Sequence, residues 1–464
     1  MLDASKLLSR RQAAPAVTRC HACIVRWMHL LERRNALIAI HGRVDSGLQN
    51  CISRERSALR GSDMTVLVTG ATGFLGTEIV RALLARDVGM RLVALIRAPD
   101  DAALERRRKA LADALPLDQR DRLEAVRGDI TERFFGLSLA AYSALAARID
   151  RVVHAAATTR FDHSLAQARR RNVDGTSEVL GFCRALKKRQ RSAGRLDYLS
   201  TAFVAGKRTG IVYENELDVG QHFRNSYEQS KFEAERLCWG ARGEFPVVIY
   251  RPSIVLGHSA TGEASSFGSL YLPMKALIEF YDLWPGVLTR LVPLPLYPAF
   301  AFDIVPVDYV AEAVADLFER PEVAGQCYHL TVGLDRAPTI QQLVDWSCDY
   351  FQVPRLRYAD RAQLLRRLGR GVQPVVERIP SRVVRRVAVL LAYYWFVHPR
   401  FDTTNALAIG LEAPRVESYF TRLLAYAYES NFGRSEARVD RRNVARHRPA
   451  EQPFGRAARA GEGR

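Results

Sequence analysis

The chain has 464 residues, 48% of them hydrophobic and 25% charged, which is the composition of a globular protein with ample core material. That length suits one large α/β domain with an appendage, or two to three ordinary domains. The net charge is +18, yet only seven of the 68 basic residues are lysines, and the arginines are spread along the whole chain. Because no recognition-helix or RNA-binding signature accompanies this charge, we predict no nucleic-acid partner, although a basic surface favours polyanionic ligands.

The sequence also argues against membrane-spanning, secreted and metal-binding classes. No apolar run approaches the roughly 20 residues that span a bilayer. The stretch Ile24–Leu31 is interrupted by Arg26 and His29, unlike the core of a signal peptide. Seven cysteines, an odd number, favour reduced thiols inside a cell. Cys20 and Cys23 form one C-x-x-C without a second pair at zinc-finger spacing, so we expect a cytoplasmic protein with no metal site.

Residues 1–63 show no strand–turn–helix pattern, and Met64 stands immediately before the first strand pattern. We therefore interpret residues 1–63 as a leader or a non-native N-terminal extension, with native translation starting at Met64. Detection of peptides from this stretch in the native protein would contradict that interpretation.

From Met64 onward, short apolar runs alternate with helical stretches, the pattern of a parallel sheet with crossover helices. The runs that we predict as strands are residues 66–69, 92–96, 123–126, 152–156, 196–199 and 247–250, with the first helix over residues 77–84. The predicted fold class is therefore α/β, a Rossmann-type doubly wound parallel sheet. Ligands of such folds bind at the carboxyl ends of the strands.

The character of the sequence changes after about Phe267. Residues 270–274 and 291–297 are apolar, aromatic and punctuated by proline, which suits either the wall of an apolar substrate pocket or an ordinary loop core. Residues 340–351 and 416–428 have the pattern of helices.

These changes suggest an order of domains. We predict a cofactor and substrate domain over residues 64–335 and a C-terminal helical subdomain over residues 336–433. Within the latter, the apolar run Val387–Val397 is too short to span a membrane. We favour a buried helix over an interfacial anchor there, and weak membrane-surface association is the alternative. The tail over residues 434–464 is rich in Arg, Gly and Ala and is predicted to be disordered.

The first predicted strand runs into three glycines with the spacing G-x-x-G-x-x-G, namely Gly70, Gly73 and Gly76. Gly70 permits the tight turn, Gly73 lets the backbone approach a pyrophosphate, and Gly76 lets the next helix pack close to the sheet. Amides at the helix N-terminus then face the phosphates. The pattern predicts a dinucleotide site, although a glycine turn between a strand and a helix is often only structural.

The residues after the second strand distinguish the two nicotinamide cofactors. A carboxylate there suits the ribose hydroxyls of NAD, whereas an arginine accommodates the 2′-phosphate of NADP. Arg97 follows the strand directly and Arg107 lies in a later arginine run, while Asp100 and Asp101 are displaced from the strand end. We therefore predict NADPH, with Arg97 as the primary phosphate contact and Arg107 in support. The alternative for the arginine run is a solvated helix face.

Tyr227 and Lys231 lie four residues apart in a helix-compatible stretch, so their side chains share one helical face. A tyrosine with an unperturbed pKa near 10 exchanges protons poorly at neutral pH, and a nearby ammonium is expected to lower that pKa. Thr201, at the end of the fifth strand, is the expected third member, a hydroxyl for the substrate oxygen. Ser200 is the alternative, because only one of two neighbours on a strand faces a site. The order of these motifs along the chain favours a catalytic role for Tyr227 and Lys231 in a redox enzyme over an ordinary pair on the protein surface.

Several ordered motifs resemble those of extended short-chain dehydrogenase/reductases. They are TGATGFLG (residues 69–76), GDI (128–130), HAA (154–156), NVDGT (172–176), LSTA (199–202), Tyr227-x-x-x-Lys231 and RPSIVLG (251–257). Within that superfamily the chain looks most like the fatty acyl-CoA reductase, male-sterility and thioester-reductase branch, through FGL (135–137), Arg97 with Ala98, and GHSATG (257–262). The resemblance covers roughly residues 64–335.

The resemblance implies NADPH-dependent reduction of an acyl thioester, carried on coenzyme A or a carrier protein, to an aldehyde or, after a second hydride, an alcohol. Thr201 and Tyr227 would hold the developing oxyanion, and Lys231 would bind the nicotinamide ribose. We expect the thioester to arrive preformed, because no adenylation or carrier domain accompanies these motifs. His258 departs from the branch, which often has an acidic residue there. The cofactor-binding residues that the resemblance implies are Gly70, Thr72, Gly73, Phe74, Leu75, Gly76, Arg97, Arg107, Asp129, Ile130, Ala155, Ala156, Asn172, Lys231, Pro252 and Ile254.

Two other classes of function stay open at this point. An extended reductase can act as a nucleotide-sugar epimerase or dehydratase, or as a hydroxysteroid dehydrogenase; the apolar residues 270–300 disfavour a sugar and do not discriminate against a sterol. A non-catalytic dinucleotide-binding regulator would have a degraded triad, whereas Thr201, Tyr227 and Lys231 are all present.

Overall fold

The computed structural model describes residues 64–161, 163–189, 194–265, 267, 271, 274–275, 299–352, 355, 399–430 and 432. All of them belong to a unit that spans residues 60–464. Residues 1–63, the run 387–397 and the tail 434–464 lie outside the described residues, as does most of the apolar stretch 270–298. The interpretations given above to these segments stay predictions.

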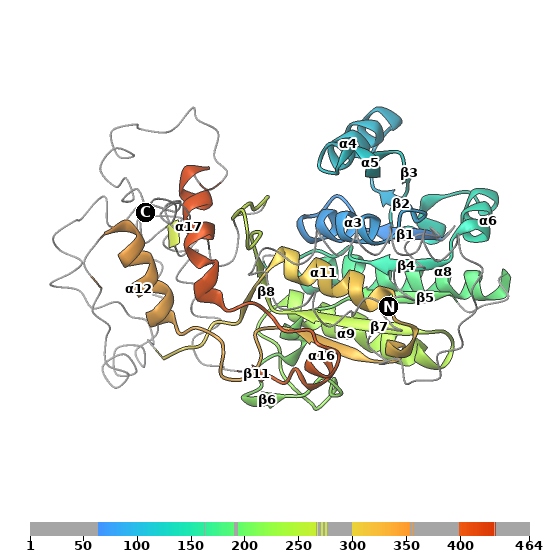
Figure 1. The fold of residues 1–464 in the computed structure, drawn as a ribbon. Helices are drawn as coiled ribbons and strands as arrows, with labels where there is room; N and C mark the ends of the chain where they lie inside the picture. The colour runs from blue at the N-terminus through green and yellow to red at the C-terminus, as the bar shows by residue number, and fades with distance from the viewer. Residues whose placement is uncertain are drawn as a thin grey trace, which may run out of the picture. The chain divides into compact units, whose positions relative to one another are not determined.

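A parallel sheet of seven strands lies at the centre of this unit (Figure 1). Its strands are β1 Thr65–Thr69, β2 Arg91–Ile96, β3 Leu123–Arg127, β4 Arg151–His154, β5 Arg195–Leu199, β7 Val247–Pro252 and β10 Cys327–Leu330. The strand order β10-β7-β5-β4-β1-β2-β3 reverses between β1 and β4, which is the point where open α/β sheets bind their ligands. The predicted doubly wound sheet is confirmed, and β10 is a further strand that the sequence pattern did not indicate.

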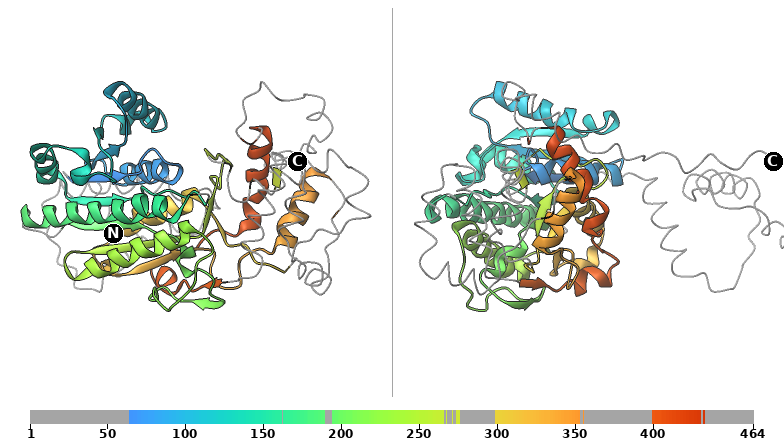
Figure 2. Two further views of the ribbon diagram at one scale, coloured as in Figure 1. Left: turned by 180° about the vertical axis from the view of Figure 1, so that it is seen from behind. Right: turned by 90° about the vertical axis from the view of Figure 1, so that its left-hand side faces the viewer.

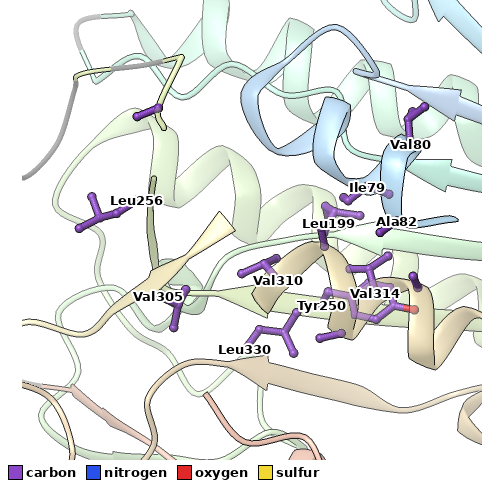
Figure 3. Close-up of a cluster of buried hydrophobic side chains, with 14 of the residues drawn as sticks. Ile79, Val80, Ala82, Leu199, Tyr250, Leu256, Val305, Val310, Val314 and Leu330 are labelled. Carbon is purple, nitrogen blue, oxygen red and sulfur yellow. The ribbon is translucent and has the colours of Figure 1, made fainter. Parts of the chain in front are cut away.

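Alternate residues of each strand face two layers of helices, so both faces of the sheet are buried. On one face, Val66 and Val68 share a core with α3 (Phe74–Arg86) and α11 (Val307–Phe318); Figure 3 shows part of this cluster. On the other face, Leu67 shares a core with α6 (Leu139–Arg148), α8 (Gly175–Arg189) and α9 (Ser226–Gly240). The view from behind in Figure 2 brings α8 and α9 to the front.

Polar caps set where three of these helices begin. Asp100 caps α4 (Asp101–Asp113), Ser138 caps α6 and Asn225 caps α9, each by accepting a backbone N–H with its side-chain oxygen. The cap at Asn225 matters most for the site, because α9 carries Tyr227 and Lys231. The remaining elements are α5 Leu117–Arg120, η2 Arg133–Gly136, α7 Leu165–Arg169, η3 Arg170–Asp174, η4 Ala202–Ala205, β6 Gly210–Val212, η5 Ala241–Gly243, β8 Ile254–Leu256, β9 Ile304–Pro306, η6 Pro321–Val323, α12 Ile340–Phe351, β11 Pro399–Phe401, α16 Thr404–Ala408, η7 Val416–Ser418 and α17 Phe420–Glu429.

The segments after residue 335 are joined to the sheet region by strand pairing and a shared core. β11 pairs in parallel with β6. The Tyr419 hydroxyl donates to the carbonyl of Ile304 at 3.1 Å, and Phe420 and Leu423 of α17 lie in the same core cluster as α3 and α11. In the part of the chain that the structure describes, no helix combines the length and apolar character needed to cross a bilayer.

Candidate active site

The loop between β1 and α3 brings backbone segments so close together that only glycine fits at two positions. Gly70 has φ +78°, and a Cβ there would lie 2.5 Å from the backbone nitrogen of Ala156. A Cβ on Gly76 would lie 2.0 Å from the carbonyl oxygen of Gly70, so α3 can approach the turn only because this residue has no side chain. The N-terminus of α3, whose first amides have no intrahelical acceptor, therefore begins directly beside the carboxyl end of β1.

A cavity of about 290 Å³ lies beside this turn, at the carboxyl ends of β1, β2 and β4. Nine predicted cofactor residues line it, namely Gly70, Thr72, Gly73, Arg97, Arg107, Asp129, Ile130, Ala155 and Ala156. The other lining residues are Thr69, Leu95, Ile96, Gly128, Thr131, Ala157, Thr158 and Arg171. A glycine turn at a helix N-terminus, apolar strand ends and exposed arginines fit the pyrophosphate, base and phosphate groups of a nicotinamide dinucleotide.

The other predicted cofactor residues do not line this cavity; they are Phe74, Leu75, Gly76, Asn172, Lys231, Pro252 and Ile254. Phe74 and Leu75 pack against the core from the first turn of α3. Asn172 is buried, and its amide oxygen accepts the N–H of Thr158 at 2.8 Å while its amide nitrogen donates to the Ser230 hydroxyl at 2.9 Å. Asn172 therefore supports the cavity wall rather than forming it.

Three arginines reach the cavity from different elements. Arg97 follows β2 and lies 4.0 Å from a carboxylate oxygen of Asp129, and Arg107 on α4 donates to the carbonyl oxygen of Arg97. The third, Arg171, was not predicted; it comes from the π-helical turn η3 and is exposed. Arg171 immediately precedes the NVDGT segment (172–176), which comes after β4, a strand whose carboxyl end lines the cavity. That position is the sequence signal by which Arg171 could have been identified.

The Thr201 side chain lies beside the Tyr227 hydroxyl and acts on its pKa as a hydrogen-bond partner, while the Thr201 hydroxyl itself donates to the carbonyl oxygen of Pro252 at 3.4 Å. Thr201 follows β5 and is buried, while Tyr227 lies in the first turn of α9. The neighbouring Ser200 points the other way, and its hydroxyl donates to Glu235 in the buried interior at 2.5 Å. This alternation along the strand favours Thr201 over Ser200 as the partner of Tyr227.

The expected lowering of the Tyr227 pKa is wrong for this structure. Burial around the hydroxyl raises the pKa of Tyr227 to about 12, the interaction with the Thr201 side chain opposes that rise, and Glu228 adds to it. The expected source of the lowering, the Lys231 ammonium, instead donates to the Tyr198 hydroxyl at 2.8 Å and to the Leu199 carbonyl at 2.7 Å. Burial lowers the pKa of Lys231 itself to about 8.

Phe161 is a second residue that the sequence did not single out. It lies in the loop after β4, is 38% exposed, and meets the Tyr227 ring edge-on with 5.7 Å between centroids. The loop is held on one side by Asn172 and on the other by the Ser226 hydroxyl, which donates to the His163 carbonyl at 2.8 Å. Phe161 thus covers one side of the phenol ring.

Known proteins similar to this chain include reductases. The L-2-aminoadipate reductase large subunit of Penicillium chrysogenum is 32% identical over 301 residues, which cover 61% of this chain and 20% of that protein. The carboxylic acid reductase of Mycobacterium marinum is 26% identical over 335 residues, which cover 68% of this chain and 28% of that protein. The chain thus spans less than a third of the length of these curated relatives.

A solved structure and a family match agree with these relatives. The terminal R domain from the myxalamid PKS-NRPS biosynthetic pathway is similar with a TM-score of 0.66 and 26% identity, covering 80% of this chain and 91% of that one. The family described as Male sterility protein matches residues 68–314, more than half of the chain. The resemblance inferred from the motifs is confirmed: the chain belongs to the Male sterility protein family, a family of nicotinamide-dependent oxidoreductases within the extended short-chain dehydrogenase/reductases.

Proposed function

We propose that this protein uses NADPH to reduce an acyl thioester to an aldehyde. The observation that carries the proposal is the pairing of the Thr201 and Tyr227 side chains at the carboxyl edge of a sheet whose switch point holds the glycine-turn cavity. In the sheet only β4 separates β5, which Thr201 follows, from β1, which precedes the glycine turn. An acyl carbonyl held by the two hydroxyls would therefore lie on the same edge as the cofactor.

The residues around the cavity favour NADPH over NADH. Arg97 and Arg107 supply positive charge at the end of β2, where a 2′-phosphate is recognised in this fold. The nearby carboxylates have other partners, because Asp100 accepts the Ala103 N–H at 2.6 Å as the cap of α4 and Asp101 pairs with Arg127 at 3.0 Å. Neither carboxylate is therefore well placed for the ribose hydroxyls of NADH.

The protein's own side chains act on the carbonyl oxygen of the substrate. When bound, the cofactor supplies a hydride for the carbonyl carbon. Thr201 and Tyr227 donate hydrogen bonds to the oxygen on which negative charge develops. With a pKa of about 12 the phenol is protonated at neutral pH, so Tyr227 acts as the proton donor to the oxygen of the hemithioacetal that hydride addition produces. Breaking of the carbon–sulfur bond then releases the aldehyde and the thiol of the carrier. Lys231 follows Tyr227 by one turn of the same helix, and we propose that it binds the nicotinamide ribose.

The proposed substrate class is based on the similar proteins and on the net charge of the chain. The relatives include a carboxylic acid reductase and an R domain from a PKS-NRPS pathway, and reduction of a carboxyl group is easier from a thioester than from a free acid. Coenzyme A and acidic carrier proteins are both polyanionic, and the chain has a net charge of +18. We propose a thioester on coenzyme A or on a carrier protein as the substrate.

The first experiment measures NADPH oxidation by the purified protein with acyl-CoA and acyl-carrier-protein substrates, with trapping of the aldehyde. We expect NADPH consumption and aldehyde formation in equal amounts. An absence of turnover with every thioester, combined with conversion of a nucleotide sugar or a hydroxysteroid, would contradict the proposal and support the other extended reductases.

The cofactor assignment predicts the effect of Arg97→Ala. Loss of a hydrogen bond to a charged phosphate weakens NADPH binding by about 10- to 100-fold, while NADH binding changes little because NADH has no 2′-phosphate. The dissociation constants can be measured through cofactor fluorescence. Arg106→Ala is the matched control, because Arg106 is an exposed arginine of α4 that does not line the cavity. Equal losses for the two cofactors in Arg97→Ala would contradict the assignment.

A further inference from the structure

The side chain of Lys231 is held inside the protein by β5, the strand that Thr201 follows. Lys231 is 3% exposed, and its ammonium donates to the Tyr198 hydroxyl at 2.8 Å and to the Leu199 carbonyl at 2.7 Å. An ammonium has three N–H donors, so these contacts use two and leave one. The orientation of the remaining donor is therefore set by Tyr198 and Leu199 rather than by solvent.

The Tyr198 hydroxyl is oriented in turn by Thr176 on α8. The Thr176 hydroxyl donates to the Asn172 carbonyl at 2.6 Å, which uses its single hydrogen. Its contacts with the Tyr198 hydroxyl and with Nε2 of His154, at 3.1 Å, must then be ones in which Thr176 accepts. Tyr198 therefore gives its proton to Thr176 and presents its lone pairs to Lys231.

His154 extends this set of contacts to the glycine turn. Because Nε2 donates to Thr176, Nδ1 is the acceptor for the Thr69 hydroxyl at 2.6 Å. Thr69 immediately precedes Gly70 and lines the cofactor cavity. Complete burial lowers the pKa of His154 to about 3, and the charge of Lys231 acts in the same direction, so the imidazole is neutral and one tautomer is fixed. Each hydroxyl and ring nitrogen in the chain of contacts is thus assigned a role.

We propose that Tyr198 is a positioning residue for Lys231, and that Thr176 and His154 tie this lysine to the glycine turn as one buried network. The network consists of Thr69, His154, Thr176, Tyr198 and Lys231, which come from β1, β4, α8, β5 and α9. The proposal rests on the proposed function only in taking Lys231 and the turn as parts of one cofactor site.

The network also sets the proton state of Lys231. The titratable groups that face Lys231 are Tyr198 on β5, His154 on β4, and Glu235 and Cys238 on α9 itself. His154 is neutral and Glu235 favours the ammonium, so removal of the Tyr198 hydroxyl deprives the ammonium of an acceptor that no other described group replaces. The pKa of Lys231, already lowered to about 8, then falls further.

The test compares Tyr198→Phe with Tyr250→Phe in the full-length protein. Tyr250 is equally buried on the neighbouring strand but belongs to the core on the opposite face of the sheet, and its hydroxyl donates to Asp197 at 2.6 Å. The readout is the dissociation constant of NADPH as a function of pH, followed by fluorescence. In the wild type, NADPH affinity should fall as the pH rises through about 8, where Lys231 loses its proton.

In Tyr198→Phe this fall should be displaced to lower pH by about one unit or more, the effect of a lost hydrogen bond to a charged group. Tyr250→Phe should keep the wild-type profile even if it lowers stability. Thr176→Val, which removes the acceptor for Tyr198, should shift the profile in the same direction, and Thr176→Ser should restore it. Coincident profiles for Tyr198→Phe and Tyr250→Phe, or a wild-type affinity that does not vary between about pH 7 and 9, would overturn the proposal.

This readout separates the inference from the proposed function. A displaced NADPH profile in a protein that reduces no thioester would support the network and contradict the substrate. Thioester reduction with coincident profiles would support the function and overturn the network.

Discussion

Tyr227→Phe is expected to lower kcat for thioester reduction by about 10²- to 10⁴-fold, the usual worth of a positioned proton donor. The substitution removes the hydroxyl that lies beside the Thr201 side chain and keeps the ring that Phe161 contacts. The dissociation constant of NADPH should stay within about twofold of wild type, because the lost hydroxyl stabilises the transition state rather than the bound cofactor. Steady-state kinetics and cofactor fluorescence measure the two quantities.

Tyr213→Phe is the matched control for this variant. Tyr213 is 45% exposed and follows β6, outside the site described here. Its kcat should equal that of the wild type. A Tyr227→Phe protein with nearly full kcat would show that the phenol is not the proton donor, and the assignment of Thr201 and Tyr227 as a catalytic pair would be abandoned.

Glu235→Gln is expected to lower the free energy of unfolding by about 3–5 kcal/mol, because it leaves the charge of Arg251 buried without a counter-ion. Both side chains are fully buried, and their closest nitrogen–oxygen distance is 2.6 Å. The Glu235 carboxylate also accepts from the Ser200 hydroxyl and, at 2.9 Å, from the indole nitrogen of Trp239. The pair thus joins β7 to α9 and contacts Ser200, the neighbour of Thr201. Urea denaturation of the purified variants gives the free energies.

Glu233→Gln on the same helix is the control for burial. Glu233 pairs with Arg169 at 2.6 Å, but the Arg169 side chain is 47% exposed, so the loss should be below about 1 kcal/mol. Comparable losses in the two variants would mean that the Glu235–Arg251 pair contributes no more than a surface pair.

Much of the fold follows from patterns that are local in the sequence. Strands such as β1 and β2 are short apolar runs bounded by turns, and each forms near its predicted residues. β10 lacks such a pattern: it has four residues, Cys327–Leu330, and contains a histidine. His329 is fully buried there because its Nδ1 reaches the carbonyl oxygen of Asp402 at 2.7 Å, a partner more than 70 residues away in the sequence.

The glycine turn of the site was predictable for the same reason, since its spacing encodes a requirement of the backbone. Gly70 and Gly76 are needed because the backbones of β1, β4 and α3 meet there. The distribution of charge was not predictable. Spacing places Tyr227 and Lys231 on one helical face, but only the packed structure shows that Tyr198 takes the ammonium and that burial raises the pKa of the phenol. Desolvation depends on residues brought together from distant strands. The spacing of a Tyr–Lys pair therefore does not determine whether the pKa of the phenol rises or falls.

The proposed function requires that hydride reach the acyl carbon of a thioester. The most direct measurement supplies NADPH deuterated at the transferred position, with an acyl-CoA or acyl-carrier-protein substrate, and analyses the aldehyde by mass spectrometry. We expect deuterium at the aldehyde carbon with the wild type and a strongly reduced yield of that product with Tyr227→Phe. An aldehyde without deuterium, or an equal yield of labelled aldehyde from both proteins, would contradict the proposed function.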